Sequence, residues 1–176
     1  MRNGIAGTTE RANLIEFPEF FRRATGKGPF PYQVRLATAE LLPQLLDIPT
    51  GLGKTAAAVL AWLWRRSRFA GEEIRIKTPP RLVYCLPMRV LVEQTGDNTV
   101  QWLQRLGLLG GTADFEDRNG AQMLRKYAPC FADPEKVTVH ILMGGEDADD
   151  WDIYPERDAI MIGTQDKLLA RALNRG

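Results

Sequence analysis

The residues best suited to chemistry lie in the segment Asp47-Ile48-Pro49-Thr50-Gly51-Leu52-Gly53-Lys54-Thr55. Gly51 and Gly53 allow backbone angles and a close approach that a Cβ atom would block. Lys54 offers a positive charge to the β- and γ-phosphates of a nucleotide, and the Thr55 hydroxyl can bind Mg²⁺. At the start of a helix, backbone N–H groups and the helix dipole add to this preference for phosphate. The segment therefore predicts an ATP-binding loop formed by Pro49, Thr50, Gly51, Leu52, Gly53, Lys54 and Thr55, with Lys54 and Thr55 catalytic and Thr55 the metal ligand.

The flanks of this loop favour the same interpretation. A short apolar run, Leu45, Leu46 and Ile48, precedes the loop, and an Ala-rich run from Thr55 to Arg66 follows it. Together they predict a strand, a loop and a helix in succession. The strict phosphate-loop pattern requires glycine where this chain has Ile48. A glycine-containing turn that happens to end in Lys-Thr is the alternative.

A second candidate lies upstream, in the segment Phe30-Pro31-Tyr32-Gln33. A glutamine side chain has both a donor and an acceptor, which suits the N6/N7 edge of adenine. Phe30 or Tyr32 could pack against the base. Gln33 therefore becomes a candidate adenine-binding residue because of its position before the loop, whereas a solvated helix residue is the alternative.

Strands and helices that alternate along the chain predict an α/β fold, an open parallel sheet with flanking helices. Besides the run before the loop, we expect strands at residues 81–87, 136–143 and 159–163. We expect helices at residues 13–25, 31–44, 55–66, 88–106, 121–131 and 165–174, and loops at residues 70–80 and 108–120. Turns at residues 49–55, 87–89, 143–145 and 163–165 then fall at the carboxyl ends of strands, where such sheets bind ligands.

Composition adds limits. The 176 residues fit about one domain. The net charge is only +1, but residues 1–90 carry 14 Lys and Arg against 7 Asp and Glu, and residues 91–176 carry 9 against 15. One interpretation of this asymmetry is that one side of the protein binds a polyanion. The alternative is that the charges lie on separate solvated faces. Two cysteines, one histidine and no long apolar run predict a reduced, cytoplasmic protein without a multi-histidine metal site. The acidic stretch at residues 146–158 lacks calcium-loop spacing and is interpreted as a solvated loop.

In order and spacing, five segments of residues 30–176 resemble the first RecA-like domain of superfamily 2 helicases. Tyr32-Gln33 resembles the adenine-reading Q motif and Ile48 to Thr55 resembles motif I. Pro87-Met88-Arg89-Val90-Leu91-Val92-Glu93-Gln94 is similar to motif Ia, Gly144-Gly145 to the double-glycine motif, and Thr164-Gln165-Asp166-Lys167-Leu168 to motif Ib. The resemblance implies ATP and Mg²⁺ as cofactors. It also implies a nucleic-acid site at Pro87, Arg89, Gly144, Gly145, Thr164 and Gln165.

Within that superfamily, the wording of the segments at residues 47–55, 86–95 and 163–176 is most similar to the type I CRISPR-associated helicase–nuclease. This family resemblance implies ATP-driven 3′-to-5′ movement on single-stranded DNA, with degradation by an HD-type metal nuclease. It implies a crRNA-guided surveillance complex as partner and no membrane. A superfamily 2 DNA or RNA helicase outside CRISPR defence, or a non-catalytic nucleotide-binding fragment, are the alternatives.

The chain also departs from the family pattern. It has no Asp-Glu dipeptide and hence no recognisable motif II, which supplies the Mg²⁺-binding Asp and the water-orienting Glu. One histidine cannot build an HD nuclease. We therefore expect an N-terminal extension at residues 1–28 and a partial RecA-like domain at residues 29–176, truncated before motif II. We expect little or no ATPase activity from these residues alone.

Overall fold

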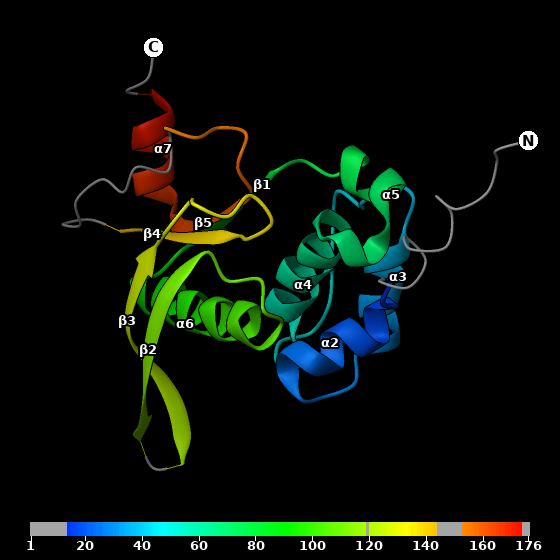
Figure 1. The fold of residues 1–176 in the computed structure, drawn as a ribbon, viewed down its shortest axis with the longest axis horizontal. Coiled ribbons are helices and arrows are strands. Elements are labelled where there is room, and N and C mark those ends of the chain that lie inside the picture. The colour runs from blue at the N-terminus through cyan, green and yellow to red at the C-terminus, as the bar shows by residue number, and fades with distance from the viewer. Residues whose placement is uncertain (1–13, 119, 144–152, 174–176) are drawn as a thin grey trace, which may run out of the picture. The chain divides into compact units, whose positions relative to one another are not determined.

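The computed structural model describes residues 14–118, 120–143 and 153–173 (Figure 1). The chain divides after Pro79 into two compact units. The first holds the predicted ATP-binding loop and the second holds the strands. Residues 144–152, which include Gly144, Gly145 and most of the acidic stretch, lie outside the described residues.

The described residues of the first unit contain helices and connecting segments, and no strand. Its elements are α2 (Phe17–Thr25), α3 (Pro31–Thr38), α4 (Lys54–Arg66), the 3₁₀ turn η1 (Arg68–Ala70) and α5 (Glu72–Lys77). Prolines occupy the first turns of α2 and α3, where a missing N–H costs no hydrogen bond. The core forms around α4, against which α2 packs aromatic side chains: the rings of Phe17 and Trp64 meet edge to face at 5.9 Å between centroids. The expected helix at residues 13–25 is confirmed from Phe17 onward, and Gly26 ends it with a φ of 75°.

Three expectations for this unit are wrong in detail. Residues 45–48 form no strand, and Leu45 is 80% exposed, because a strand needs a neighbouring strand to pair its backbone and the described part of this unit holds no other strand. The expected helix at residues 31–44 ends at Thr38, where Ala39 turns to an extended conformation. The guanidinium of Arg65 binds the backbone there. Residues 70–80, expected as a loop, contain the short helix α5, begun by acidic residues and closed by basic ones.

The second unit contains the predicted parallel sheet. Its strands are β1 (Arg81–Leu86), β4 (Thr138–Leu142) and β5 (Ala159–Thr164), arranged in the order β1-β5-β4. Helix α6 (Arg89–Arg105) follows β1 and helix α7 (Gln165–Leu173) follows β5, and the two helices lie on opposite faces of the sheet (Figure 1). The central strand β5 is buried over residues 159–163. The α/β class, the three strands and both helices agree with the sequence prediction.

The region between α6 and β4 differs from the prediction. Residues expected as a loop and a helix instead form an antiparallel hairpin of β2 (Gly111–Arg118) and β3 (Ala121–Pro129). At its end, the Asp117 carboxylate accepts a hydrogen bond from the Gly120 N–H, and Gly120 has a φ of 79°. The loop was expected from the Gly, Asp and Asn content of residues 108–120. In β2, however, Asp114 and Glu116 alternate with Ala113 and Phe115, which is the period of a strand with one solvated face.

Candidate functional site

The ATP-binding loop precedes α4 directly, as the sequence predicts. Gly51 and Gly53 have φ angles of 84° and 74°, in the left-handed region where any other residue would be strained. Gly53 is the residue before the first turn of α4, so the first N–H groups of that helix face the loop. Residues 49–53 are exposed. This arrangement offers backbone donors at a helix N-terminus to an anion.

Lys54 lies at the first position of α4. Its Nζ donates a hydrogen bond to the Ile48 carbonyl oxygen at 2.8 Å, which folds the side chain back over the loop. A lysine ammonium has three donors, so this contact leaves others for phosphate oxygens. Thr55 follows in the first turn, half-buried. The loop therefore fits a nucleotide phosphate, and Thr55 is in the position from which a hydroxyl can bind Mg²⁺.

Two side chains of helix α3 hydrogen-bond the backbone of the loop. The Tyr32 hydroxyl donates to the Leu52 carbonyl at 2.6 Å, and the Gln33 Nε2 donates to the Gly53 carbonyl at 3.1 Å. A trans peptide directs its C=O and the next N–H in opposite directions. Because the carbonyls of residues 52 and 53 face α3, the N–H groups of Gly53 and Lys54 point away from it. The two α3 side chains thus set the direction of the loop's backbone donors.

The Gln33 side chain is held at both ends. Its Oε1 accepts the Phe30 N–H at 2.8 Å, while Nε2 contacts the Gly53 carbonyl and, at 3.4 Å, the Tyr32 hydroxyl oxygen. The residue is 1% exposed. A Cβ atom at Gly53 would come within 3.1 Å of Nε2, so glycine there also makes room for this contact. Adenine recognition by Gln33 stays a prediction, since the contacts of the amide in this structure are to the protein itself.

The aromatic rings of Phe30 and Tyr32 lie near Gln33 and stack on each other. They stack at 6.3 Å between centroids with planes 14° apart, and Phe30 is 48% exposed. The exposed ring of Phe30 is accessible to a ligand, and its packing against adenine stays a prediction. The sequence did not single out the Tyr32 hydroxyl as an anchor for the loop, because a contact across 20 residues leaves no local pattern. Burial raises the pKa of Tyr32 above its usual value.

A second candidate site lies at the carboxyl ends of β1 and β5. These strands pair so that Leu86 lies opposite Thr164, which places the turns that follow them side by side. Helices α6 and α7 begin immediately beyond these turns. A hollow of about 430 Å³ lies there, lined by Pro87, Arg89, Thr164, Asp166, Lys167 and Ala170.

The structure thus brings together three of the predicted nucleic-acid residues, Pro87, Arg89 and Thr164, in one hollow. Gln165 is exposed at the first position of α7, next to Thr164, and is not among the lining residues. Gly144 and Gly145 lie outside the described residues. Lys167 is a lining residue that sequence reasoning did not assign. Its signal is its place one helical turn after Thr164 in the segment similar to motif Ib.

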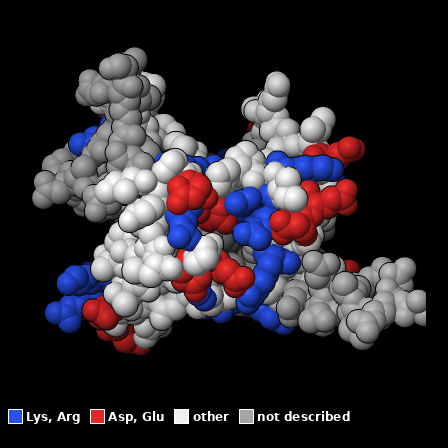
Figure 2. Space-filling model, turned by 45° about the horizontal axis from the view of Figure 1, so that its top comes forward, with Lys and Arg blue, Asp and Glu red and all other residues white. Residues whose placement is uncertain are grey.

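The charges of this hollow suit a phosphate chain. Arg89 and Lys167 contribute cations and Asp166 contributes one carboxylate. The N-terminal end of α6 carries no side-chain cap, so its backbone donors are available to an anion. Elsewhere basic and acidic side chains are interspersed over the surface drawn in Figure 2, where blue and red groups lie close together. The face drawn in Figure 2 therefore carries no broad basic patch among its described residues.

Other kinds of site have less support. Within the described ranges, no three His, Cys, Asp or Glu side chains gather where they could hold a metal ion. Cys85 and Cys130 are exposed and not joined in a disulfide. No helix in the described part of the chain is long and apolar enough to cross a membrane.

Comparison with known proteins agrees with this geometry. A family model described as DEAD/DEAH box helicase matches residues 35–175. The match includes the ATP-binding loop, α4, the sheet and the hollow at its edge, and it begins just after Gln33. A search of curated proteins found no match. Since the matched region spans most of the chain, the chain belongs to the DEAD/DEAH box helicase family, whose members use ATP.

Proposed function

We propose that the chain is the ATP-binding and strand-holding part of an ATP-dependent DNA translocase, of the type of the CRISPR-associated helicase–nuclease. One observation carries the proposal of ATP binding: Tyr32 and Gln33 hydrogen-bond two carbonyls of the loop, so that the loop N–H groups point away from α3. The CRISPR assignment rests on the amino-acid sequences of the segments at residues 47–55, 86–95 and 163–176. Single-stranded DNA and a crRNA-guided surveillance complex are the proposed partners.

Each of the two sites has a defined task in this proposal. Gly51, Gly53 and Lys54 bind the phosphates, and Thr55 would hold a Mg²⁺ ion, which would neutralise phosphate charge. Arg89, with Thr164 and the N-terminal end of α6, holds DNA phosphates, which positions a strand without reading its sequence. Movement follows if nucleotide binding changes how tightly this unit and a second RecA-like domain close on the strand.

Nucleotide binding is tested with a fluorescent ATP analogue and Mg²⁺. Lys54→Ala should lower the affinity at least tenfold, because the ammonium is the cation of the loop. Lys77→Ala removes the same charge from the exposed surface of α5 and should bind like the wild type. Equal affinity of wild type and Lys54→Ala would overturn the ATP assignment. In the full-length protein, normal unwinding by Lys54→Ala would overturn the helicase assignment.

Strand binding is tested by fluorescence anisotropy with single-stranded DNA at several salt concentrations. Each lost phosphate contact should reduce the slope of log K against log salt by about 0.7. We expect this loss for Arg89→Ala, with Lys77→Ala again as the control. An unchanged slope and affinity for Arg89→Ala would remove the hollow from the strand path. RNA of the same sequence that binds more tightly than DNA would favour an RNA helicase.

The CRISPR assignment has its own test. The full-length protein should shift a crRNA-guided surveillance complex on its target DNA in a native gel, and should not shift the same DNA bearing no complex to the same extent. Equal binding to both would favour a general superfamily 2 helicase. Nucleotide binding without hydrolysis by the full-length protein would instead favour a non-catalytic module.

A further inference from the structure

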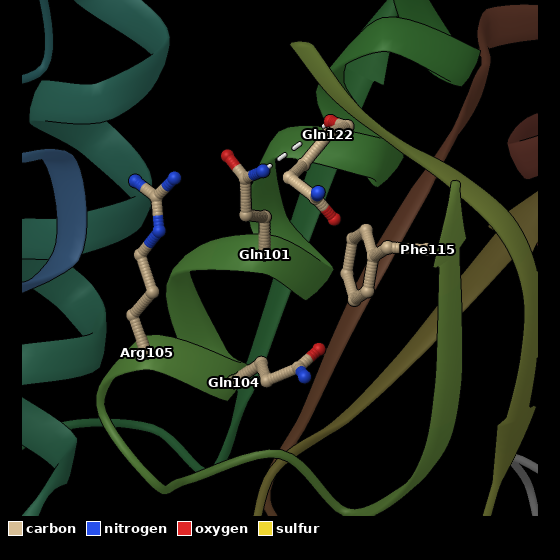
Figure 3. Close-up of a pocket in the computed structure, with 5 residues that line it drawn as sticks. All are labelled: Gln101, Gln104, Arg105, Phe115 and Gln122. Carbon is tan, nitrogen blue, oxygen red and sulfur yellow. Dashed lines mark hydrogen bonds between the residues drawn. The ribbon is translucent and has the colours of Figure 1, made fainter. Parts of the chain in front are cut away.

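A second hollow lies in the second unit, away from the hollow at the carboxyl ends of β1 and β5. It separates the C-terminal half of α6 from the β2–β3 hairpin and has a volume of about 170 Å³. Figure 3 shows the ring of Phe115 facing into it, with carboxamide side chains around the ring. The lining residues are Gln101, Gln104, Arg105, Phe115 and Gln122.

Two regular elements place these side chains together. Gln101, Gln104 and Arg105 are three and four residues apart on α6, so they share one face of the helix. In the hairpin, Phe115 lies opposite Leu124 and Asp117 lies opposite Gln122. Opposed residues of an antiparallel pair point to the same face, and side chains alternate along each strand, so Phe115 and Gln122 share the face toward α6. The register shifts between Asp114 and Phe115, a bulge that re-aims the strand at this point.

The amide groups of this hollow retain hydrogen-bonding capacity. The Gln101 Nε2 donates to the Gln122 backbone carbonyl at a long 3.4 Å. Among the described residues, the side-chain amides of Gln104 and Gln122 have no protein partner. A carboxamide offers both donors and an acceptor, which is the pattern on the edge of a nucleobase. The half-buried Phe115 ring offers a flat apolar face beside these amides.

Charge gives the hollow a direction. Arg105 is the last residue of α6 and lines the hollow. Glu93 and Asp97 lie nearer the start of the same helix, and Asp97 is one turn before Gln101. The Asp117 carboxylate on the hairpin accepts the Gly120 N–H at the hairpin end. A ligand with a flat base and a phosphate would therefore place the phosphate toward Arg105 and away from Asp97.

We propose that this hollow binds one unpaired base of the single strand, stacked on Phe115 and hydrogen-bonded by Gln101, Gln104 and Gln122. The inference rests on the proposed function, because it assigns a further contact of the same strand outside the hollow at residues 87 and 164. An aromatic platform with surrounding amides is the chemistry by which proteins hold splayed-out bases.

The test compares two single-stranded DNA oligonucleotides of equal length, one with bases and one with abasic sites, by fluorescence anisotropy. Phe115→Leu keeps an apolar side chain but removes the flat ring, and Gln104→Ala changes an exposed residue without touching the core. Stacking of one base is worth about 1–3 kcal/mol, so Phe115→Leu should weaken binding of the base-bearing strand about fivefold or more. Its affinity for the abasic strand should stay that of the wild type.

Matched controls use surface positions outside the hollow. Met123→Ala changes the hairpin on its other face, since Met123 lies opposite Glu116, and Gln44→Ala removes an amide from the first unit. Neither should alter the preference for bases. If the wild type binds both strands equally, or if Phe115→Leu and Gln104→Ala retain the full preference, the base site is refuted while strand binding stands. If the wild type binds neither strand, the proposed function falls as well.

Discussion

Replacing Gln33 by glutamate tests how α3 controls the ATP-binding loop. The two side chains have nearly the same shape, so the change exchanges the amide nitrogen for an oxygen and gives the group the ability to ionise. That oxygen would face the Gly53 carbonyl oxygen at about the 3.1 Å now spanned by the hydrogen bond. The acceptor for the Phe30 N–H is retained. Any effect therefore reports the contact between α3 and the loop.

The magnitude follows from burial. Losing the hydrogen bond costs about 1 kcal/mol, and a polar group left unsatisfied at a 1% exposed position adds about 1–3 kcal/mol. We expect Gln33→Glu to lower the free energy of unfolding by about 2–4 kcal/mol at neutral pH. With a typical urea dependence of about 2 kcal/mol per molar, the unfolding midpoint should fall by about 1–2 M. Trp62 and Trp64, buried in α4, provide the fluorescence signal in the same unit.

The pH dependence distinguishes this explanation from general disruption. Burial and the facing carbonyl raise the pKa of the new carboxyl in the folded state above its unfolded value of about 4.3. A group with a raised folded pKa stabilises the fold below the unfolded pKa, and that stability is lost as pH rises through the folded pKa. The deficit of Gln33→Glu should thus shrink on acidification, because the protonated carboxyl can again donate to the Gly53 carbonyl.

Gln44→Glu makes the same chemical change at an exposed position of the same unit and serves as the control. Its unfolding midpoint should stay near that of the wild type at each pH. A nucleotide analogue should also bind Gln33→Glu less tightly, since the loop donors lose their orientation. The reasoning is refuted if both glutamate variants unfold alike, or if the deficit of Gln33→Glu is the same at pH values on both sides of the raised pKa.

Two further changes test the packing of each unit. Arg65→Met keeps the apolar stem but removes the donors to the carbonyls of Ala37 and Ala39, at 3.0 and 2.6 Å, so urea unfolding should show a loss of about 1.5–3 kcal/mol; an unchanged midpoint would contradict the role of Arg65 at the end of α3. Burial, followed by the nearby Glu93 charge, raises the pKa of Asp97, so Asp97→Asn should raise the melting temperature at neutral pH. That gain should vanish as pH falls below the unfolded value of 3.8, and a gain independent of pH would contradict it.

The backbone geometry of residues 51–54 and the turns at the strand ends could be predicted because their signals are local. Gly51 and Gly53 need left-handed backbone angles, and Lys54 stands at a helix N-terminus, whatever the rest of the chain does. The buried runs at β4 and β5 were likewise visible, because strands covered on both faces are continuously apolar. The hairpin was missed because residues 108–120, rich in Gly, Asp and Asn, resemble a loop in composition, and residues 121–131 were expected as a helix.

The sequence alone determined the α/β class and a glycine loop at the start of a helix, since glycine angles, helix starts and apolar runs depend on neighbouring residues. Only the tertiary structure decided which groups meet across distance. It placed the Tyr32 hydroxyl and the Gln33 amide on two successive loop carbonyls, joined the turns after β1 and β5 at one edge, and set Phe115 opposite the glutamines of α6. Such contacts leave no local pattern, because strand order, register and helix packing are fixed by burial of the whole unit.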